Sequence, residues 1–206
     1  MGLNGFTGQH GILVALLSGA VGWTLSAPVA MAQAEFKVAP VAEKTVTELP
    51  TGPLYWGIET FPALAEAEAA AGPLSLATEA GGKAWLFTLG PKGAPTQRGT
   101  AVAEVGPLED VAAQEYLLSI REGTAPAGVK TMVHTHPGTE AFYVLEGQLT
   151  FRTKSGVDVV DAGKTLAGVG PDTPMEASST GTADLHELIM FIVDPGKPFA
   201  SPATFE

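Results

Sequence analysis

The sequence predicts an all-β domain, an antiparallel sandwich or closed barrel, and three observations carry that prediction. Short runs of β-forming residues recur from residue 84 to residue 193. Turn residues separate these runs, with Gly-Pro pairs at 90–91, 106–107 and 170–171. The composition, 25 Gly and 16 Pro in 206 residues, also indicates many turns. Regularly spaced short strands of this kind are typical of antiparallel sandwiches and barrels.

Residues 1–34 have the character of a secretory signal peptide. They contain no Asp, Glu, Lys or Arg, and residues 11–25 form an apolar run that is short for a membrane span. Two overlapping A-x-A cleavage patterns end at Ala32 and Ala34. We therefore expect cleavage and a periplasmic or secreted protein with no stable membrane insertion. The alternative is an anchor formed by an uncleaved N-terminal segment.

Residues 35–82 are expected to form an N-terminal arm with one short helix, ahead of a β-domain at 83–206. Pro and Gly residues punctuate the arm between positions 40 and 53, and a strand is expected near 54–58, where Tyr55 and Trp56 would anchor the arm to the barrel. The alanine-rich stretch 62–71 predicts a helix, because Pro62 suits a first turn and Gly72-Pro73 ends it.

From residue 84 onward the pattern is one of strands. Two turns between apolar runs are expected to make hairpins, at Glu146-Gly147 and at 154–156. The last run, L-H-E-L-I-M-F-I-V, is apolar on both sides, which indicates a central strand. The runs expected as strands are 84–89, 100–105, 115–121, 129–134, 141–145, 148–153, 157–160, 165–169 and 185–193.

Charge and composition exclude several function classes. The chain has 11 Lys+Arg against 22 Asp+Glu, a formal net charge of -11, so its surface repels phosphate backbones and nucleic-acid binding is not expected. With no cysteine, there can be no disulfide, thiolate ligand or cysteine nucleophile. The sequence contains no glycine-rich phosphate loop and no nucleophile-elbow pattern, which argues against nucleotide cofactors and serine hydrolase chemistry.

The stretch from Gly128 to Gly147, G-V-K-T-M-V-H-T-H-P-G-T-E-A-F-Y-V-L-E-G, carries the strongest chemical signal. His134 and His136 share one face of an extended strand because side chains alternate. Pro137-Gly138 breaks the strand, and a tight reversal there would return Glu140 toward the two imidazoles. Two imidazoles and one carboxylate are the ligand set of a divalent metal. The alternative is a metal-free remnant of such a site.

This stretch resembles the first motif of the cupins. Gly128, His134-x-His136, Glu140 and Gly147 match that motif at every fixed position. The resemblance implies a single small antiparallel jelly-roll barrel with the metal inside it. It also implies that the two histidines and Glu140 are the metal ligands, that the two glycines lie in turns, and that the protein is a homodimer.

The second cupin motif departs from the family pattern. In the segment G-V-G-P-D-T-P-M-E, the position of the family's fourth ligand, a histidine, holds Met175, which Glu176 follows. Three interpretations stay open. The site is a facial triad of His134, His136 and Glu140; or Met175 is a thioether ligand, which favours Cu(I); or the site is weakened and Met175 lines a pocket.

His186 and Glu176 are further candidates for the fourth ligand or the pocket. His186 would supply a nitrogen if its strand turned it inward, although an outward position is the favoured expectation. Phe142, Phe151 and Arg121 are expected in the substrate pocket, where Arg121, like Arg152 or Lys130, would hold a carboxylate.

The function expected from these features is that of an exported metalloenzyme. An oxygenase, isomerase or lyase would act on a small organic substrate, with one Fe, Mn, Ni or Zn ion, or Cu if Met175 is a ligand. The alternative is a non-catalytic binding or sensor protein for a metal or small ligand, since one fold hosts many functions.

Overall fold

Three antiparallel sheets and one short helix make up the part of the chain that the computed structural model describes, residues 34–94 and 98–206. The all-β prediction is confirmed. The expected signal peptide lies outside the described residues, except for Ala34. No helix among residues 34–94 and 98–206 is long and apolar enough to span a membrane.

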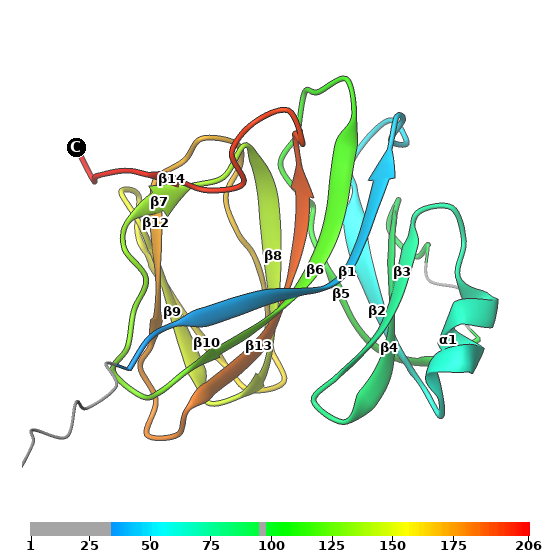
Figure 1. Ribbon diagram of the computed structural model, residues 1–206, viewed down its shortest axis with the longest axis horizontal. Helices are drawn as coiled ribbons and strands as arrows, with labels where there is room; N and C mark the ends of the chain where they lie inside the picture. Colours follow the sequence, from blue (N-terminus) through cyan, green and yellow to red (C-terminus); the bar gives the residue numbers. More distant parts are fainter. Residues whose placement is uncertain (1–33, 95–97) are drawn as a thin grey trace, which may run out of the picture. The chain divides into compact units, whose positions relative to one another are not determined.

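The middle layer, which we call the central sheet, contains five strands and is built around the long C-terminal apolar strand (Figure 1). In spatial order its strands are β1 (Lys37–Val46), β6 (Tyr116–Ala125), β13 (Leu185–Val193), β8 (Gly138–Glu146) and β11 (Thr165–Ala167). The central place expected for the last apolar run is confirmed, because β13 pairs with β6 on one side and with β8 on the other.

A second sheet of five strands, the barrel sheet, lies on one side of the central sheet (Figure 1). Its spatial order is β10 (Val157–Asp161), β9 (Gln148–Thr153), β12 (Met175–Ser179), β7 (His134–Thr135) and β14 (Ser201–Pro202). Ile189, Phe191 and Val193 of β13 share a buried core with Leu149 and Phe151 of this sheet. The two sheets therefore enclose one apolar interior.

A third sheet of four strands, the outer sheet, lies on the other side of the central sheet (Figure 1). Its spatial order is β3 (Ser75–Ala80), β4 (Lys83–Gly90), β2 (Tyr55–Phe61) and β5 (Thr100–Val105). Leu188, Met190 and Ile192 of β13 pack against Trp56 and Trp85 of this sheet. Burying apolar side chains on both faces explains why the last run has no polar face.

The short helix predicted at 62–71 is present as α1 (Leu64–Ala70). Ala67 and Ala70 form a small cluster with Leu86 of β4. A helix of this length is marginal alone, so its packing on the outer sheet holds it in place.

Residues 35–82 contain three strands in addition to the helix, where the sequence indicated one. β1 includes Pro40, and its register with β6 shifts between Pro40 and Ala42. Proline is tolerated there because β1 is an edge strand. β3 pairs with β4 through a turn at Gly81-Gly82, so the expected boundary at 82/83 falls within a hairpin.

Two expectations near the metal motif are wrong in detail. The run 129–134 is mostly irregular: Lys130 makes an isolated bridge with Ser178, and β7 covers only His134–Thr135. The Glu146-Gly147 turn does not close a hairpin, because β8 lies in the central sheet and β9 in the barrel sheet. The hairpin expected at 154–156 is confirmed between β9 and β10.

Candidate functional site

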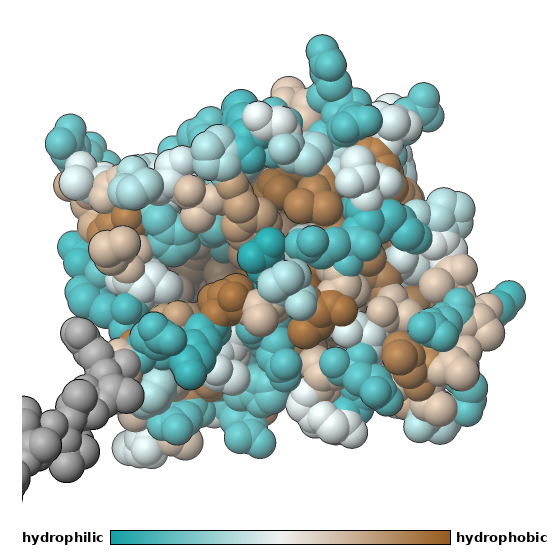
Figure 2. Space-filling view, in the orientation of Figure 1, coloured by the Kyte–Doolittle hydropathy of each residue, from teal (hydrophilic) through white to brown (hydrophobic). Residues whose placement is uncertain are grey.

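A cavity of about 240 Å³ lies between the central sheet and the barrel sheet. Aromatic side chains make up much of its wall, contributed by Phe36, Phe142, Phe191 and Phe199. The ionisable side chains that line it are His134, His136, Glu140, Glu187 and Arg121. Figure 2 shows a hollow in the surface over these two sheets. We call this cavity the barrel pocket.

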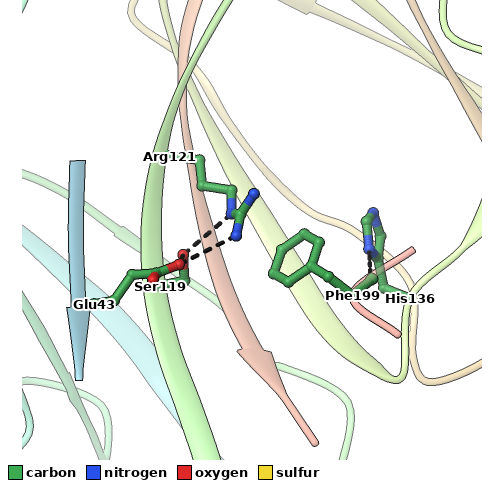
Figure 3. A network of polar contacts seen from close by, with 5 residues as sticks. All are labelled: Glu43, Ser119, Arg121, His136 and Phe199. Carbon is green, nitrogen blue, oxygen red and sulfur yellow. Dashed lines mark hydrogen bonds and ion pairs between the residues drawn. The ribbon is translucent and has the colours of Figure 1, made fainter. Parts of the chain in front are cut away.

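The two motif histidines lie side by side in the pocket wall, and backbone carbonyls fix their orientation. Their ring centroids are 4.9 Å apart, and the ring planes are perpendicular. His134 Nδ1 donates to the Met132 carbonyl at 2.8 Å, and His136 Nδ1 donates to the Phe199 carbonyl at 2.6 Å (Figure 3). Because a carbonyl only accepts, Nδ1 carries a hydrogen in both rings, which leaves Nε2 as the nitrogen available to a ligand or metal when a ring is neutral.

Glu140 approaches His136 from the central sheet. The chain crosses from β7 to β8 at Pro137-Gly138, which places Glu140 Oε2 3.8 Å from His136 Nε2. Burial lowers the pKa of His136 to about 4, and the nearby His134 and Arg121 charges add to this effect. Burial raises the pKa of Glu140 well above its usual value, with a further contribution from Glu187. His136 is therefore a neutral imidazole at pH 7.

Glu187 is the site residue that sequence reasoning missed. It lies in β13, is fully buried and lines the barrel pocket. Neither of its carboxyl oxygens has a hydrogen-bond partner among the described residues. Burial raises its pKa from 4.5 to about 8. The available signal was a carboxylate in a strongly apolar run; alternation puts Glu187 in phase with Ile189 and Phe191, and the structure shows that this face of the strand lines the pocket.

Of the three candidates for a further ligand, only Met175 is in the pocket wall. It is buried, begins β12 and pairs in register with His134. Glu176 is outside the lining and makes an ion pair with Lys130 at 2.9 Å. His186 is on the opposite face of the central sheet, where Nε2 lies 2.7 Å from Glu122 Oε1. The strand's alternation, which turns Glu187 inward, turns His186 away.

Phe142 and Arg121 line the pocket, whereas Phe151 packs against Phe142 with ring centroids 5.3 Å apart and is outside the lining. The guanidinium of Arg121 stacks on the Phe199 ring, 3.6 Å from the ring centroid. In Figure 3 the Phe199 ring lies between Arg121 and His136. Arg121 Nε donates to Ser119 Oγ at 3.2 Å and its Nη2 to Glu43 Oε1 at 3.1 Å.

The other two basic side chains considered for this role are held elsewhere. Arg152 lies over Phe205 at 4.6 Å, Lys130 is paired with Glu176, and neither lines the barrel pocket. Arg121 is therefore the basic residue of the candidate site among the described residues.

Two antiparallel five-stranded sheets enclose the pocket, the chain crosses between them at Pro137-Gly138 and at Gly147, and the motif side chains point inside. That arrangement decides the fold. The domain has the antiparallel jelly-roll fold that the resemblance to the cupins implies. Gly128 and Gly147 have positive φ angles of 85° and 73°, which fits the turn positions that the motif implies.

Comparison with known proteins finds solved structures that match part of this chain at low similarity. The DMSP lyase DddQ from Ruegeria pomeroyi is 19% identical, with a TM-score of 0.38, over 43% of this chain and 44% of its own. A cupin-like protein from Thermotoga maritima is 13% identical, with a TM-score of 0.38, over 43% of this chain and 65% of its own. The polyketide cyclase RemF from Streptomyces resistomycificus is 16% identical, with a TM-score of 0.36, over 43% of this chain and 62% of its own.

This chain thus spans less than half the length of the DMSP lyase. No protein-family model matches the chain, and no curated protein matches it. The jelly-roll assignment rests on the strand order and the motif.

The donors in the barrel pocket are of the kinds that bind a divalent cation. Both imidazoles have Nδ1 engaged by a carbonyl, which is the outer-shell arrangement of metal-binding histidines. Glu187 has two buried oxygens without hydrogen-bond partners among the described residues, and a cation would satisfy them. Within residues 34–94 and 98–206, no group of three or more His, Asp or Glu side chains is arranged to hold a metal ion as it stands. The pocket is therefore matched to a divalent cation by the kinds of donor atom it contains, imidazole nitrogens and carboxyl oxygens.

Glu187 makes the stability of the metal-free protein depend on pH. Its folded-state pKa of about 8 exceeds its usual 4.5, so its stabilising contribution is present below pH 4.5 and lost as pH rises toward 8. The pKa of His136 is lowered from 6.5 to about 4, so its stabilising contribution is complete above pH 6.5 and is lost only as the pH falls below that value. Between pH 6.5 and 8, we therefore expect the Tm of the wild type to fall more than that of Glu187→Gln. Thermal unfolding with a chelator present measures this, and equal slopes would contradict it.

Proposed function

We propose that this protein is an exported, metal-dependent cupin enzyme that acts on a small organic substrate in the barrel pocket. One divalent cation, Fe, Mn, Ni or Zn, would be held by His134, His136 and Glu140. One observation carries the proposal: two imidazoles with Nδ1 bound to carbonyls share a buried, aromatic-lined pocket with Glu140. Buried polar groups set in an apolar cavity are the usual composition of a ligand site.

The bound cation would supply Lewis acidity, or reactivity toward O₂ in the case of iron. The protein's own residues provide the surroundings for that chemistry. Phe142, Phe191 and Phe199 restrict water around the histidines, which strengthens every electrostatic contact there. The Phe199 carbonyl holds the His136 ring in one orientation and one tautomer.

The pocket supports a small anionic substrate. Its volume of about 240 Å³ is below the ~300–1,000 Å³ of pockets for drug-sized ligands. Arg121 places a positive charge in the pocket wall. Its hydrogen bonds to Ser119 and Glu43 fix the orientation of the guanidinium. A guanidinium fixed in this way suits a carboxylate. We therefore propose a small carboxylic acid as substrate, for oxygenation, isomerisation or a lyase reaction.

The cellular setting is part of the proposal. The charge-free segment 1–34 supports export to the periplasm or the exterior. We also propose a homodimer. Size-exclusion chromatography with light scattering on the processed protein tests the oligomeric state, and N-terminal sequencing of the exported chain tests cleavage after Ala34.

Arg121→Gln is expected to weaken the binding of small carboxylates such as acetate and malonate by about 10- to 100-fold, because an ionic hydrogen bond contributes ~1.5–3 kcal/mol. Arg152→Gln is the matched control, since that guanidinium lies over Phe205, outside the pocket lining. Isothermal titration of the metal-loaded proteins measures the affinities. Equal carboxylate affinities in the wild type and Arg121→Gln would contradict an anion site at Arg121.

The test of function is incubation of the metal-loaded protein with a panel of small carboxylic acids, in air and under nitrogen, with products followed by NMR. A product that requires the metal and decreases in Arg121→Gln supports the enzyme. A product formed only in air indicates oxygenation. Tight binding of an acid without any product overturns the enzyme proposal in favour of a binding or sensor protein.

A further inference from the structure

Glu187 lies among apolar residues on the pocket side of the central sheet. Along β13, Glu187, Ile189 and Phe191 all line the barrel pocket, whereas Leu188 and Met190 pack against the outer sheet. Glu187 is thus a carboxylate at a position that its strand otherwise fills with apolar side chains. It is 0% exposed, so water does not solvate it.

The neighbouring strands make room for this side chain. Gly123 of β6 is the register partner of Glu187. A Cβ at Gly123 would lie 2.9 Å from Glu187 Cγ and 3.0 Å from Oε1, so any larger residue there would displace the carboxylate. On the other side, the pairing of β13 with β8 shifts between His186 and Glu187. Such irregularities re-aim side chains and are common beside active sites.

The fold itself gives the Glu187 carboxylate no partner. Its two oxygens have no hydrogen bond among residues 34–94 and 98–206, whereas buried Glu140 faces His136 and buried Glu176 is paired with Lys130. A buried carboxyl group without a partner is costly in either protonation state, and proteins retain one where a ligand or metal completes it. Glu140, His134 and His136 line the same pocket as Glu187.

We propose that Glu187 is the fourth protein ligand of the cation that His134, His136 and Glu140 bind. This inference rests on the proposed function. The donor set would then be two imidazole nitrogens and two carboxylates, whose charges neutralise a divalent cation inside an apolar pocket. Oxygen and nitrogen donors of this kind favour Mn, Fe, Ni or Zn over Cu(I). Met175 is then a wall residue of the pocket.

The test compares Glu187→Gln with the wild type and with Glu176→Gln. Glu176 is also a buried glutamate, but it is bonded to Lys130 and lies outside the pocket lining. Loss of an outer-shell partner weakens metal binding by about 10- to 100-fold, so loss of a direct ligand is expected to cost at least about 100-fold. Titration with Mn(II) and Co(II) gives the affinities, and the visible spectrum of the Co(II) form reports the ligand set. Glu176→Gln should match the wild type in both.

A second variant keeps the proposal testable if Glu187→Gln folds poorly. Gly123→Ala leaves the Glu187 carboxylate in the chain but crowds it, so we expect weaker Co(II) binding and an altered Co(II) spectrum. If Glu187→Gln keeps the wild-type Co(II) affinity and spectrum, Glu187 is not a ligand, and the site consists of three residues. If Glu187→Gln does not fold, the same result in Gly123→Ala leads to the same conclusion. If the wild type itself binds no Mn(II) or Co(II), the proposed function fails first.

Discussion

His136→Ala is expected to weaken divalent-metal binding by at least about 100-fold, because it removes a direct donor where loss of an outer-shell partner alone costs about 10- to 100-fold. The structure places His136 Nε2 3.8 Å from Glu140 Oε2 and holds the ring through the Phe199 carbonyl. Titration of the purified variant with Mn(II) or Co(II) measures the loss.

His186→Ala is the matched control for this variant. His186 is on the opposite face of the central sheet and is bonded to Glu122, so its removal should leave metal affinity within a factor of about two of the wild type. A large loss of affinity in His186→Ala, or none in His136→Ala, would contradict the assignment of ligands.

Gly147→Ala is expected to destabilise the fold by about 2–5 kcal/mol. Two costs add: φ is 73°, which disfavours a side chain by ~1–2 kcal/mol, and crowding in a packed site costs ~1–3 kcal/mol. The crowding arises because a Cβ at Gly147 would lie 2.5 Å from the Asp184 carbonyl oxygen and 3.0 Å from Leu185 Cα. Urea unfolding of the metal-free protein measures the change in the free energy of unfolding.

Gly128→Ala separates the two costs. Gly128 is the other motif glycine, with φ of 85°, but nothing lies within 4 Å of a Cβ built there. We therefore expect only the backbone cost of ~1–2 kcal/mol. Equal destabilisation by the two substitutions would show that contact with Asp184 is not what requires glycine at position 147.

Much of the barrel could be predicted from the sequence because its strands have strong local signals. The strands at 100–105 and 148–153 have the bounds that the sequence indicates, and the doubly apolar run at 185–193 is the central strand. In the first motif, the spacing alone indicated that His134, His136 and Glu140 meet, because it determines faces and turns over a few residues.

The strands that sequence reasoning missed have weak local signals. β12 reads M-E-A-S-S and buries Met175, Ala177 and Ser179 on its inner face, so small and polar residues occupy positions where β-formers are expected. β1 contains a proline, which only its edge position permits. In both cases tertiary packing, not local preference, determines the structure.

Glu187 and His186 show why the site could not be completed from the sequence. They are adjacent in a strand that is apolar on both faces, so alternation alone does not say which one points into the pocket. The pairing of β13 with β6 and β8 decides it: Glu187 faces the cavity opposite Gly123, and His186 faces Glu122.

The central claim is that the barrel pocket holds a divalent metal through His134, His136 and Glu140. Elemental analysis of the processed protein, purified without a histidine tag beside a Glu140→Ala variant, tests it most directly. We predict roughly one Fe, Mn, Ni or Zn ion per chain in the wild type and loss of that metal in the variant. Wild-type protein that contains no metal, even after reconstitution, or a variant that keeps a full complement, would contradict the claim.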